Sequence, residues 1–153
     1  IKNQNTLIKL HLIGKLQTNK VKYVIPLFDF VHSLDSLKLA EKISKEQKRL
    51  NKYLKYFIQV NIGDEDQKSG IQINAAEKFY DTCKNELELD IVGLMCIPPV
   101  DQDSEKYFSE MQKLKIKLKL KELSMGMSAD YLKAIKFSSS FVRIGSKIFG
   151  ERN

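Results

Sequence analysis

The sequence is poor in cysteine, proline and glycine, and each shortage excludes a class of protein. Among its 153 residues there are two cysteines, three prolines and seven glycines. Cys83 and Cys96 have neither metal-site nor redox spacing, so we expect two small buried hydrophobic side chains in a reducing compartment. With 42% hydrophobic and 29% charged residues, the chain has the composition of a globular domain and not of a disordered or fibrous protein.

Long hydrophobic runs are missing as well. No apolar stretch approaches the roughly 18 residues that a membrane-spanning helix needs, and no secretory signal is visible. We therefore expect a cytoplasmic protein without a membrane partner. The chain begins with Ile1 and not with Met, which leaves open that an amino-terminal part of the protein is absent from this sequence.

Arginine is scarce although the net charge is +7. Of the 26 basic residues, only Arg49, Arg143 and Arg152 are arginines, and the other 23 are lysines distributed among acidic residues. Proteins that read nucleic acids concentrate arginine and interleave aromatic side chains. We interpret the lysines as solvated helix faces and expect no nucleic-acid partner, with a basic α/β nucleic-acid-binding module as an alternative.

Common catalytic and metal-binding motifs are absent too. The sequence contains no Ser-His-Asp arrangement, Walker loop or GxGxxG fingerprint. The two histidines, His11 and His32, have no acidic or cysteine partner at ligand spacing, which predicts structural histidines and no metal site.

What the sequence does contain is a regular alternation of strand-like and helix-like segments. This alternation, without hairpin signals, predicts a parallel sheet with crossover helices. A complete eight-stranded barrel takes more than about 200 residues, so two folds stay open: a doubly wound open sheet, or a (β/α)8 barrel lacking its first two units, which the missing Met favours. The expected strands are 7–13, 28–32, 53–61, 89–96, 123–125 and 141–144, and the expected helices are 16–25 (ended by Pro26), 37–50 (capped by Ser36), 74–85, 103–119 and 129–137.

The stretch from Phe141 to Gly150 contains the clearest site signal. Phe141 to Ile144 predicts a short buried strand, Gly145 ends it and lets main chain approach a ligand, and Ser146 is expected to cap a short helix. Amides at such a helix start attract phosphate, and barrels build a phosphate site after their last two strands. A plain turn is the alternative.

A second loop of the same kind comes earlier in the chain. Ser128 is expected at a helix start, so that two loops would surround one phosphate, and a helix cap alone is the alternative. Arg143 lies on a strand whose inward positions should be apolar, so it needs a partner if it is buried. Its planar guanidinium group could donate hydrogen bonds to a ring nitrogen or a phosphate, and a structural salt bridge is the alternative.

Six segments together carry a more specific signal. They are 11–20 (HLIGKLQTNK), 31–36 (VHSLDS), 59–62 (QVNI) with 68–70 (KSG), 93–98 (GLMCIP), 123–130 (LSMGMSAD) and 142–150 (VRIGSKIFG). In this order they resemble the stand-alone pyridoxal-phosphate-binding barrel proteins of the YggS/PROSC family, also called pyridoxal phosphate homeostasis proteins, over nearly the whole chain.

The resemblance implies a (β/α)8 barrel of the alanine racemase N-terminal type. Residues 1–153 would form one domain that contains about the last six βα units of this barrel. An arginine at the pyridine nitrogen of the implied cofactor, pyridoxal 5′-phosphate (PLP), keeps that nitrogen unprotonated and weakens the ring as an electron sink. The implied PLP-binding residues are Ser128, Gly145 and Ser146 at the phosphate, Arg143 at the pyridine nitrogen, and Met95 and Met127 near the ring.

The resemblance also implies a function, and the sequence differs from the family in one respect. In the family, a lysine on the first barrel strand forms a Schiff base with PLP, and none of the 23 lysines here lies in that motif. We therefore expect weak, non-covalent PLP binding by this chain. The implied role is vitamin B6 and amino-acid homeostasis without catalytic turnover, with PLP-dependent apoenzymes as partners and a monomeric full-length form. A PLP-dependent racemase or lyase on the same barrel is the alternative.

Overall fold

The computed structural model describes residues 7–65, 67–100 and 102–150, in which strands and helices alternate along the chain. The strands are β1 (His11–Leu12), β2 (Phe30–Leu34), β3 (Lys55–Asn61), β4 (Ile71–Gln72), β5 (Asp90–Met95), β6 (Glu122–Met127) and β7 (Phe141–Arg143). The helical segments are η1 (Thr18–Lys20), α1 (Val21–Leu27), α2 (Leu37–Leu50), η2 (Ile73–Ala75), α3 (Ala76–Asp81), η3 (Thr82–Glu86), α4 (Ser104–Lys117), α5 (Tyr131–Lys136) and α6 (Ser146–Phe149).

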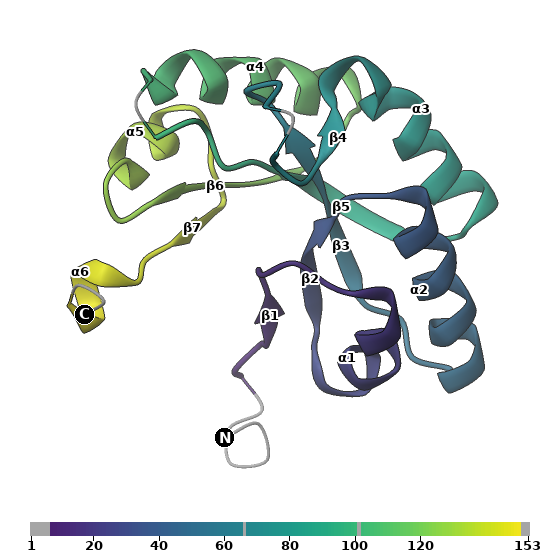
Figure 1. Cartoon of the computed structure of the whole chain (residues 1–153). Helices are drawn as coiled ribbons and strands as arrows, with labels where there is room; N and C mark the ends of the chain where they lie inside the picture. Colours follow the sequence, from purple (N-terminus) through teal and green to yellow (C-terminus); the bar gives the residue numbers. More distant parts are fainter. Residues whose placement is uncertain (1–6, 66, 101, 151–153) are drawn as a thin grey trace.

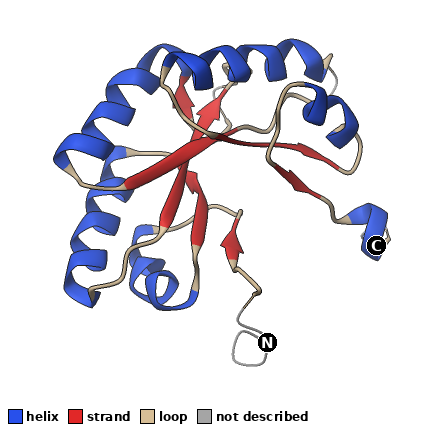
Figure 2. Cartoon of the chain, turned by 180° about the vertical axis from the view of Figure 1, so that it is seen from behind, coloured by secondary structure: helices blue, strands red, loops and turns tan. Residues whose placement is uncertain are grey.

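All strand pairings in the described part of the chain are parallel. The order is β1-β2-β3-β5-β6-β7, with the short β4 beside β3. The sheet is curved, with helices on its outer side and with β1 and β7 as its two edges (Figure 1). The view from behind shows the same arrangement (Figure 2). The parallel sheet with crossover helices predicted from the sequence is therefore confirmed.

Side-chain caps explain where the two longest helices begin. Ser36 Oγ accepts a hydrogen bond from Leu39 N at 3.4 Å and caps α2, which ends at Asn51 in the left-handed conformation with φ 46°. At the start of α4, Asp103 Oδ1 accepts from Glu105 N at 3.2 Å. These caps satisfy main-chain N–H groups that have no partner within the helix. Both helices were predictable for this reason.

Pro26 does not end the first helix, contrary to the expectation. α1 continues to Leu27 with Pro26 in its last turn. A proline in that place removes only one main-chain hydrogen bond, and Phe28 N still donates to Val24 O at 3.0 Å. The next strand therefore begins at Phe30, two residues later than the expected strand 28–32.

The segment between β3 and β5 also differs from the expectation. Ile71 and Gln72 pair with Val60 and Asn61 at the end of β3 and form β4, which the sequence pattern did not predict. The helix expected over 74–85 is divided into η2, α3 and the π-helical η3. Such short pairings depend on contacts between segments and not on local periodicity.

The two faces of the sheet carry different side chains. On the convex side, strand residues such as Ile58 and Leu94 share one hydrophobic core with Phe108 and Met111 of α4. On the other side, rings from β1, β2 and β3 contact a ring of β7. None of these three strands is a neighbour of β7 in the sheet, so the contacts reach across the concave face and the rings lie on it. The rings are those of His11, Phe30, His32, Phe57 and Phe141.

Both cysteines are buried and unpaired, as expected from the sequence. Burial raises the pKa of the Cys83 thiol and of the Cys96 thiol to about 12, so neither is a thiolate at neutral pH. Among the described residues, no helix has the length and apolar character needed to cross a membrane.

Gly126 determines how α5 packs on the end of β6. Its φ is 92°, and an added Cβ would lie 2.6 Å from Ala134 Cβ and 3.0 Å from Tyr131 Cα. The loop that follows is held by Asp130 Oδ1, which accepts from Met127 N at 2.7 Å. Helix α5 therefore begins at Tyr131, two residues later than the expected helix 129–137.

We expect Gly126→Ala to lower the free energy of unfolding by about 2–3 kcal/mol, because it combines a strained positive φ with a clash against Ala134 and Tyr131 of α5. Chemical denaturation measures this change. Gly145→Ala is the control, since its added Cβ would meet no described atom outside its chain neighbours within 4 Å, and it should alter stability by less than about 0.5 kcal/mol. Equal effects of the two substitutions would contradict this role of Gly126.

Candidate functional site

The carboxyl ends of β6 and β7 bring two loops together. Ser128, in the loop after β6, accepts hydrogen bonds at its Oγ from Gly145 N at 3.2 Å and from Lys147 N at 3.4 Å, both after β7. Two main-chain amides of one loop thus converge on one hydroxyl of the other loop, at the carboxyl edge of the sheet. The two loops that the sequence singled out meet in the structure.

Neither serine of these loops is the helix cap that the sequence predicted. Helix α5 starts after Asp130 without a side-chain cap, so the alternative of Ser128 as a cap of its own helix is wrong. Ser146 is the first residue of α6, after Gly145 at the cap position. The reason is that Ser128 reaches across from the other loop and accepts from Lys147 N, an amide that a local cap would otherwise bind.

The space beside Gly145 is open. Its φ is −119°, which does not require glycine, and an added Cβ would meet no described atom outside its chain neighbours within 4 Å. Neither main-chain strain nor packing within the described part of the chain accounts for a glycine here. Room for a group that approaches the main chain closely is a remaining physical reason for it.

Arg143 extends from β7 across the end of β6 to β5. Its Nη1 donates to Ser124 O at 2.8 Å and to Ser124 Oγ at 2.9 Å, and its Nη2 donates to Cys96 O at 2.8 Å. No described carboxylate forms an ion pair with it, so the salt-bridge alternative finds no support. A guanidinium has five N–H groups, so at least two remain for a further acceptor.

The two methionines that the resemblance implicated lie next to these residues in the sheet. Met95 of β5 is the register partner of Ser124, and Met127 of β6 is the register partner of Arg143. Met95 is buried, whereas 47% of Met127 is exposed. The structure thus gathers all six residues predicted for the site at the ends of three adjacent strands.

A chain of polar side chains crosses the concave face beneath this site. Ser124 Oγ lies 2.8 Å from His32 Nδ1, and His32 Nε2 lies 2.8 Å from His11 Nδ1. Sequence reasoning treated the histidines as separate structural residues and did not select Ser124. The available signal was a polar residue on each of several otherwise apolar strands, but strand pairing was needed to connect them.

Both imidazoles are neutral at pH 7. Burial, followed by the nearby His11 and Arg143, lowers the pKa of His32 to about 3. Burial also lowers the pKa of His11, against the opposing effect of Asp29. In the part of the chain that the structure describes, no group of three or more His, Cys, Asp or Glu side chains could hold a metal ion.

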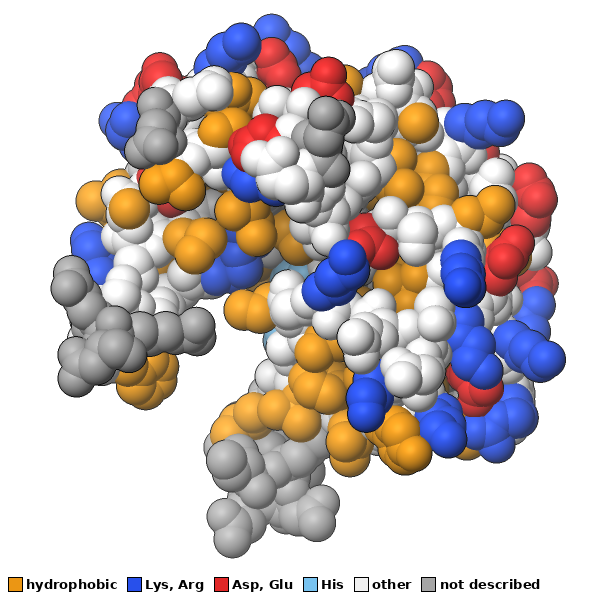
Figure 3. Space-filling view, in the orientation of Figure 1, with side chains coloured by type: hydrophobic (Ala, Val, Ile, Leu, Met, Phe, Trp, Pro, Cys, Tyr) orange, Lys and Arg blue, Asp and Glu red, His pale blue; other side chains and the backbone are white. Residues whose placement is uncertain are grey.

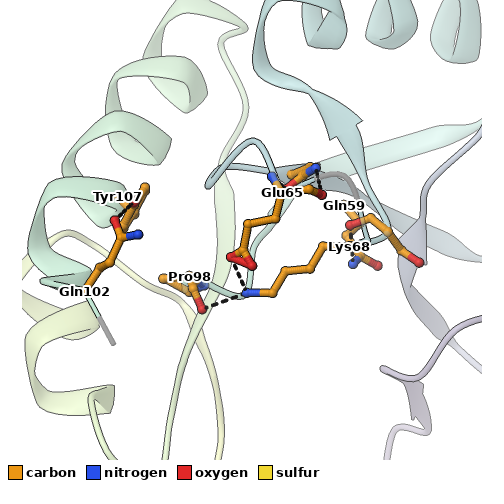
Figure 4. A network of polar contacts seen from close by, with 8 residues as sticks. Gln59, Glu65, Lys68, Pro98, Gln102 and Tyr107 are labelled. Atoms are coloured by element: carbon orange, nitrogen blue, oxygen red, sulfur yellow. Dashed lines mark hydrogen bonds and ion pairs between the residues drawn. The ribbon is translucent and has the colours of Figure 1, made fainter. Parts of the chain in front are cut away.

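Polar contacts hold the loop after β3 against β3 and the loop after β5 (Figure 4). Lys68 Nζ forms an ion pair with Glu65 Oε1 at 2.8 Å and donates to Pro98 O at 3.5 Å. Gln59 Nε2 donates to Ser69 O at 3.0 Å. These contacts join the loops after β3 and β5 and keep the Lys68 amine paired.

A cavity of about 430 Å³ lies at the opposite ends of the strands. Ligands of parallel α/β folds bind beyond the carboxyl ends of the strands. This cavity lies at their amino-terminal ends and is therefore separate from the candidate site. Its lining includes Lys55, Lys84, Lys119 and Lys121 together with Phe30 and Phe141.

Comparisons with known proteins agree on one family. Residues 5–153 match the family described as alanine racemase, N-terminal domain. A pyridoxal phosphate homeostasis protein of Pasteurella multocida is 39% identical over 160 residues, which cover 98% of this chain and 69% of that protein. One from Aquifex aeolicus is 36% identical over 154 residues, covering 95% and 68%.

A solved structure of the same kind matches the fold. PipY of Synechococcus elongatus, without PLP, superposes with a TM-score of 0.87 at 28% identity and covers 97% of this chain and 75% of that one. With PLP bound, the TM-score is 0.83 over 97% and 74% of the two chains. The open parallel sheet with outer helices is therefore of the alanine racemase barrel type and not a doubly wound sheet. The chain belongs to the family of pyridoxal phosphate homeostasis proteins, which carry the alanine racemase N-terminal domain.

Proposed function

We propose that this chain binds PLP at the carboxyl ends of β6 and β7 and serves PLP homeostasis without catalytic turnover of its own. The observation that carries the proposal is the convergence of Ser128 Oγ on the amides of Gly145 and Lys147. The PLP-bound structure of PipY, a relative with the same fold, supports it.

The residues of the two loops fit a phosphate group. The amides of Gly145 and Lys147 now donate to Ser128 Oγ, and a phosphate oxygen can take over both donors. The Ser128 hydroxyl keeps its proton and becomes a third donor. The open space beside Gly145 gives the phosphate room to approach the main chain.

Arg143 fits the other end of the cofactor. It is a permanent cation that can only donate, and its remaining N–H groups can donate to the lone pair of a pyridine nitrogen. When bound, PLP supplies an electron sink, and a donor that keeps its ring nitrogen unprotonated weakens that sink. This favours a binding and carrier role, in the reducing cytoplasm that the two unpaired buried cysteines fit.

Within this role we propose PLP-dependent apoenzymes as recipients and a monomeric full-length form. A racemase or lyase is the second candidate, because the matching domain family is named after alanine racemase. Chiral analysis of L-amino acids incubated with protein and PLP separates the two. Racemisation or loss of amino acid above the protein-free rate would favour the enzyme.

We predict that Ser128→Ala weakens binding of a phosphate-bearing ligand roughly fivefold, because one hydroxyl donor is lost. The ligand for this titration is 4′-deoxypyridoxine 5′-phosphate, which has no aldehyde and therefore cannot react with the 23 lysines. Isothermal titration calorimetry gives the dissociation constant. Ser138→Ala is the matched control, because Ser138 is exposed and its hydroxyl accepts a hydrogen bond from Gln112 Nε2, away from the proposed phosphate site. Equal affinities of the two variants would contradict the phosphate site.

Gly145→Ala separates binding from stability. Its added methyl group fills the open space where we place the phosphate, so we predict at least roughly tenfold weaker binding of the same ligand. Thermal unfolding should be nearly unchanged, since the added Cβ meets no atom of the described chain within 4 Å. Unchanged affinity in the folded variant would argue against a ligand beside Gly145.

Arg143→Lys tests the contact to the ring nitrogen. The substitution keeps the charge and removes the planar fork, so we predict roughly tenfold weaker binding of 4′-deoxypyridoxine 5′-phosphate. Binding of inorganic phosphate, which has no ring, should stay the same. Arg49→Lys on the surface of α2 is the control. A parallel loss for both ligands would mean that Arg143 acts on the phosphate and not on the ring.

A further inference from the structure

The polar chain on the concave face has a direction that its chemistry can fix. Arg143 is able only to donate, so Ser124 Oγ accepts from its Nη1 at 2.9 Å. We propose that Ser124 then donates to His32 and His32 donates to His11, which holds both imidazoles as Nε2–H tautomers. In this arrangement Ser124 and His32 are positioning residues for Arg143, a role that rests on the PLP site proposed above.

The opposite direction leaves a buried proton without an acceptor. If His32 Nδ1 donated to Ser124 Oγ, the hydroxyl proton of Ser124 would have to point elsewhere. Ser124 is fully buried, and its Oγ has no other hydrogen-bond partner among the described residues. Burying an unsatisfied donor is costly, so the population of the reverse arrangement should be lower by a factor of roughly ten or more.

The direction continues to the edge strand. With His32 Nδ1 as an acceptor, the proton of this neutral ring is on Nε2, which donates to His11 Nδ1 over 2.8 Å. His11 therefore carries its own proton on Nε2, an atom without a hydrogen-bond partner in the described part of the chain. Stacking on Phe57 and on Phe30, each with ring centroids 4.2 Å apart, keeps the two imidazole planes in place.

The last side chain of this hydrogen-bond series, His11, is accessible. His11 is half-buried on the edge strand β1, and histidine atoms are visible in a notch of the surface (Figure 3). An Nε2–H in that place is a neutral donor for an acceptor atom that enters the concave face. The chain therefore connects the guanidinium to a second hydrogen-bonding group without placing another charge there.

The same hydrogen-bonded side chains, Ser124 and His32, orient Arg143. A lone pair of Ser124 Oγ faces Nη1 as long as its proton is directed to His32, and the main-chain oxygens of Ser124 and Cys96 fix the rest of the fork. Without the Nδ1 acceptor of His32, the hydroxyl can rotate and its contact to Nη1 weakens. The N–H groups left for a ligand then lose part of their fixed direction.

Nitrogen-15 NMR of histidine-labelled protein tests the direction without any ligand. In the ligand-free chain at pH 7 we expect Nε2–H for both rings. Ser124→Ala should abolish the single tautomer of His32, whereas Ser44→Ala should leave both rings unchanged, because this buried serine donates to Leu87 O instead. An Nδ1–H tautomer or a cationic ring at His32 in the unsubstituted protein would overturn the proposal.

Ligand affinity tests the positioning role. We expect Ser124→Ala and His32→Phe to weaken binding of 4′-deoxypyridoxine 5′-phosphate about three- to tenfold, with inorganic phosphate binding unchanged. His32→Phe retains the stack on Phe57 and so serves if Ser124→Ala fails to fold. Unchanged affinity in folded His32→Phe would refute the positioning role. If the unsubstituted chain bound no ligand, the PLP proposal and this role would both fail, while the tautomers would still decide the direction of the chain.

Discussion

A guanidinium on the concave face of a parallel sheet needs hydrogen-bond acceptors, and Arg143 of β7 finds them at Ser124 of β6 and at Cys96, directly after β5. Ser124 supplies its carbonyl and hydroxyl oxygens, and Cys96 supplies its carbonyl oxygen, all within 2.9 Å. Removing a charge from water is expensive unless hydrogen bonds compensate for it. The ends of β5, β6 and β7 are therefore joined through one side chain, next to the loops where Ser128 and Gly145 meet.

Two glycines make this corner possible for different reasons. Gly126 is required by the fold itself, because its φ is positive and α5 lies against it. Among the described residues, neither conformation nor packing requires the glycine at position 145, and the space beside its added Cβ is open. Gly126 is thus explained by the fold, and Gly145 is the position where we propose that the phosphate approaches the main chain.

The fold and the meeting of the two loops after β6 and β7 were largely predictable, and the hydrogen bonds between the candidate site residues were not. Regular alternation and local caps such as Ser36 give the parallel sheet its order, because these signals act within a few residues. The strand β4 depends on Val60 and Asn61, which pair with it from the end of β3 about ten residues earlier in the chain. For the same reason Ser124 escaped notice, since its role arises only when β6 lies between the strands of Arg143 and Cys96.

A crystal structure of the protein with 4′-deoxypyridoxine 5′-phosphate tests the proposed PLP site most directly. We expect phosphate oxygens within hydrogen-bonding distance of Ser128 Oγ and of the amides of Gly145 and Lys147, with the ring nitrogen facing Arg143. A phosphate bound instead among Lys55, Lys84 and Lys119, in the cavity at the opposite ends of the strands, would contradict it.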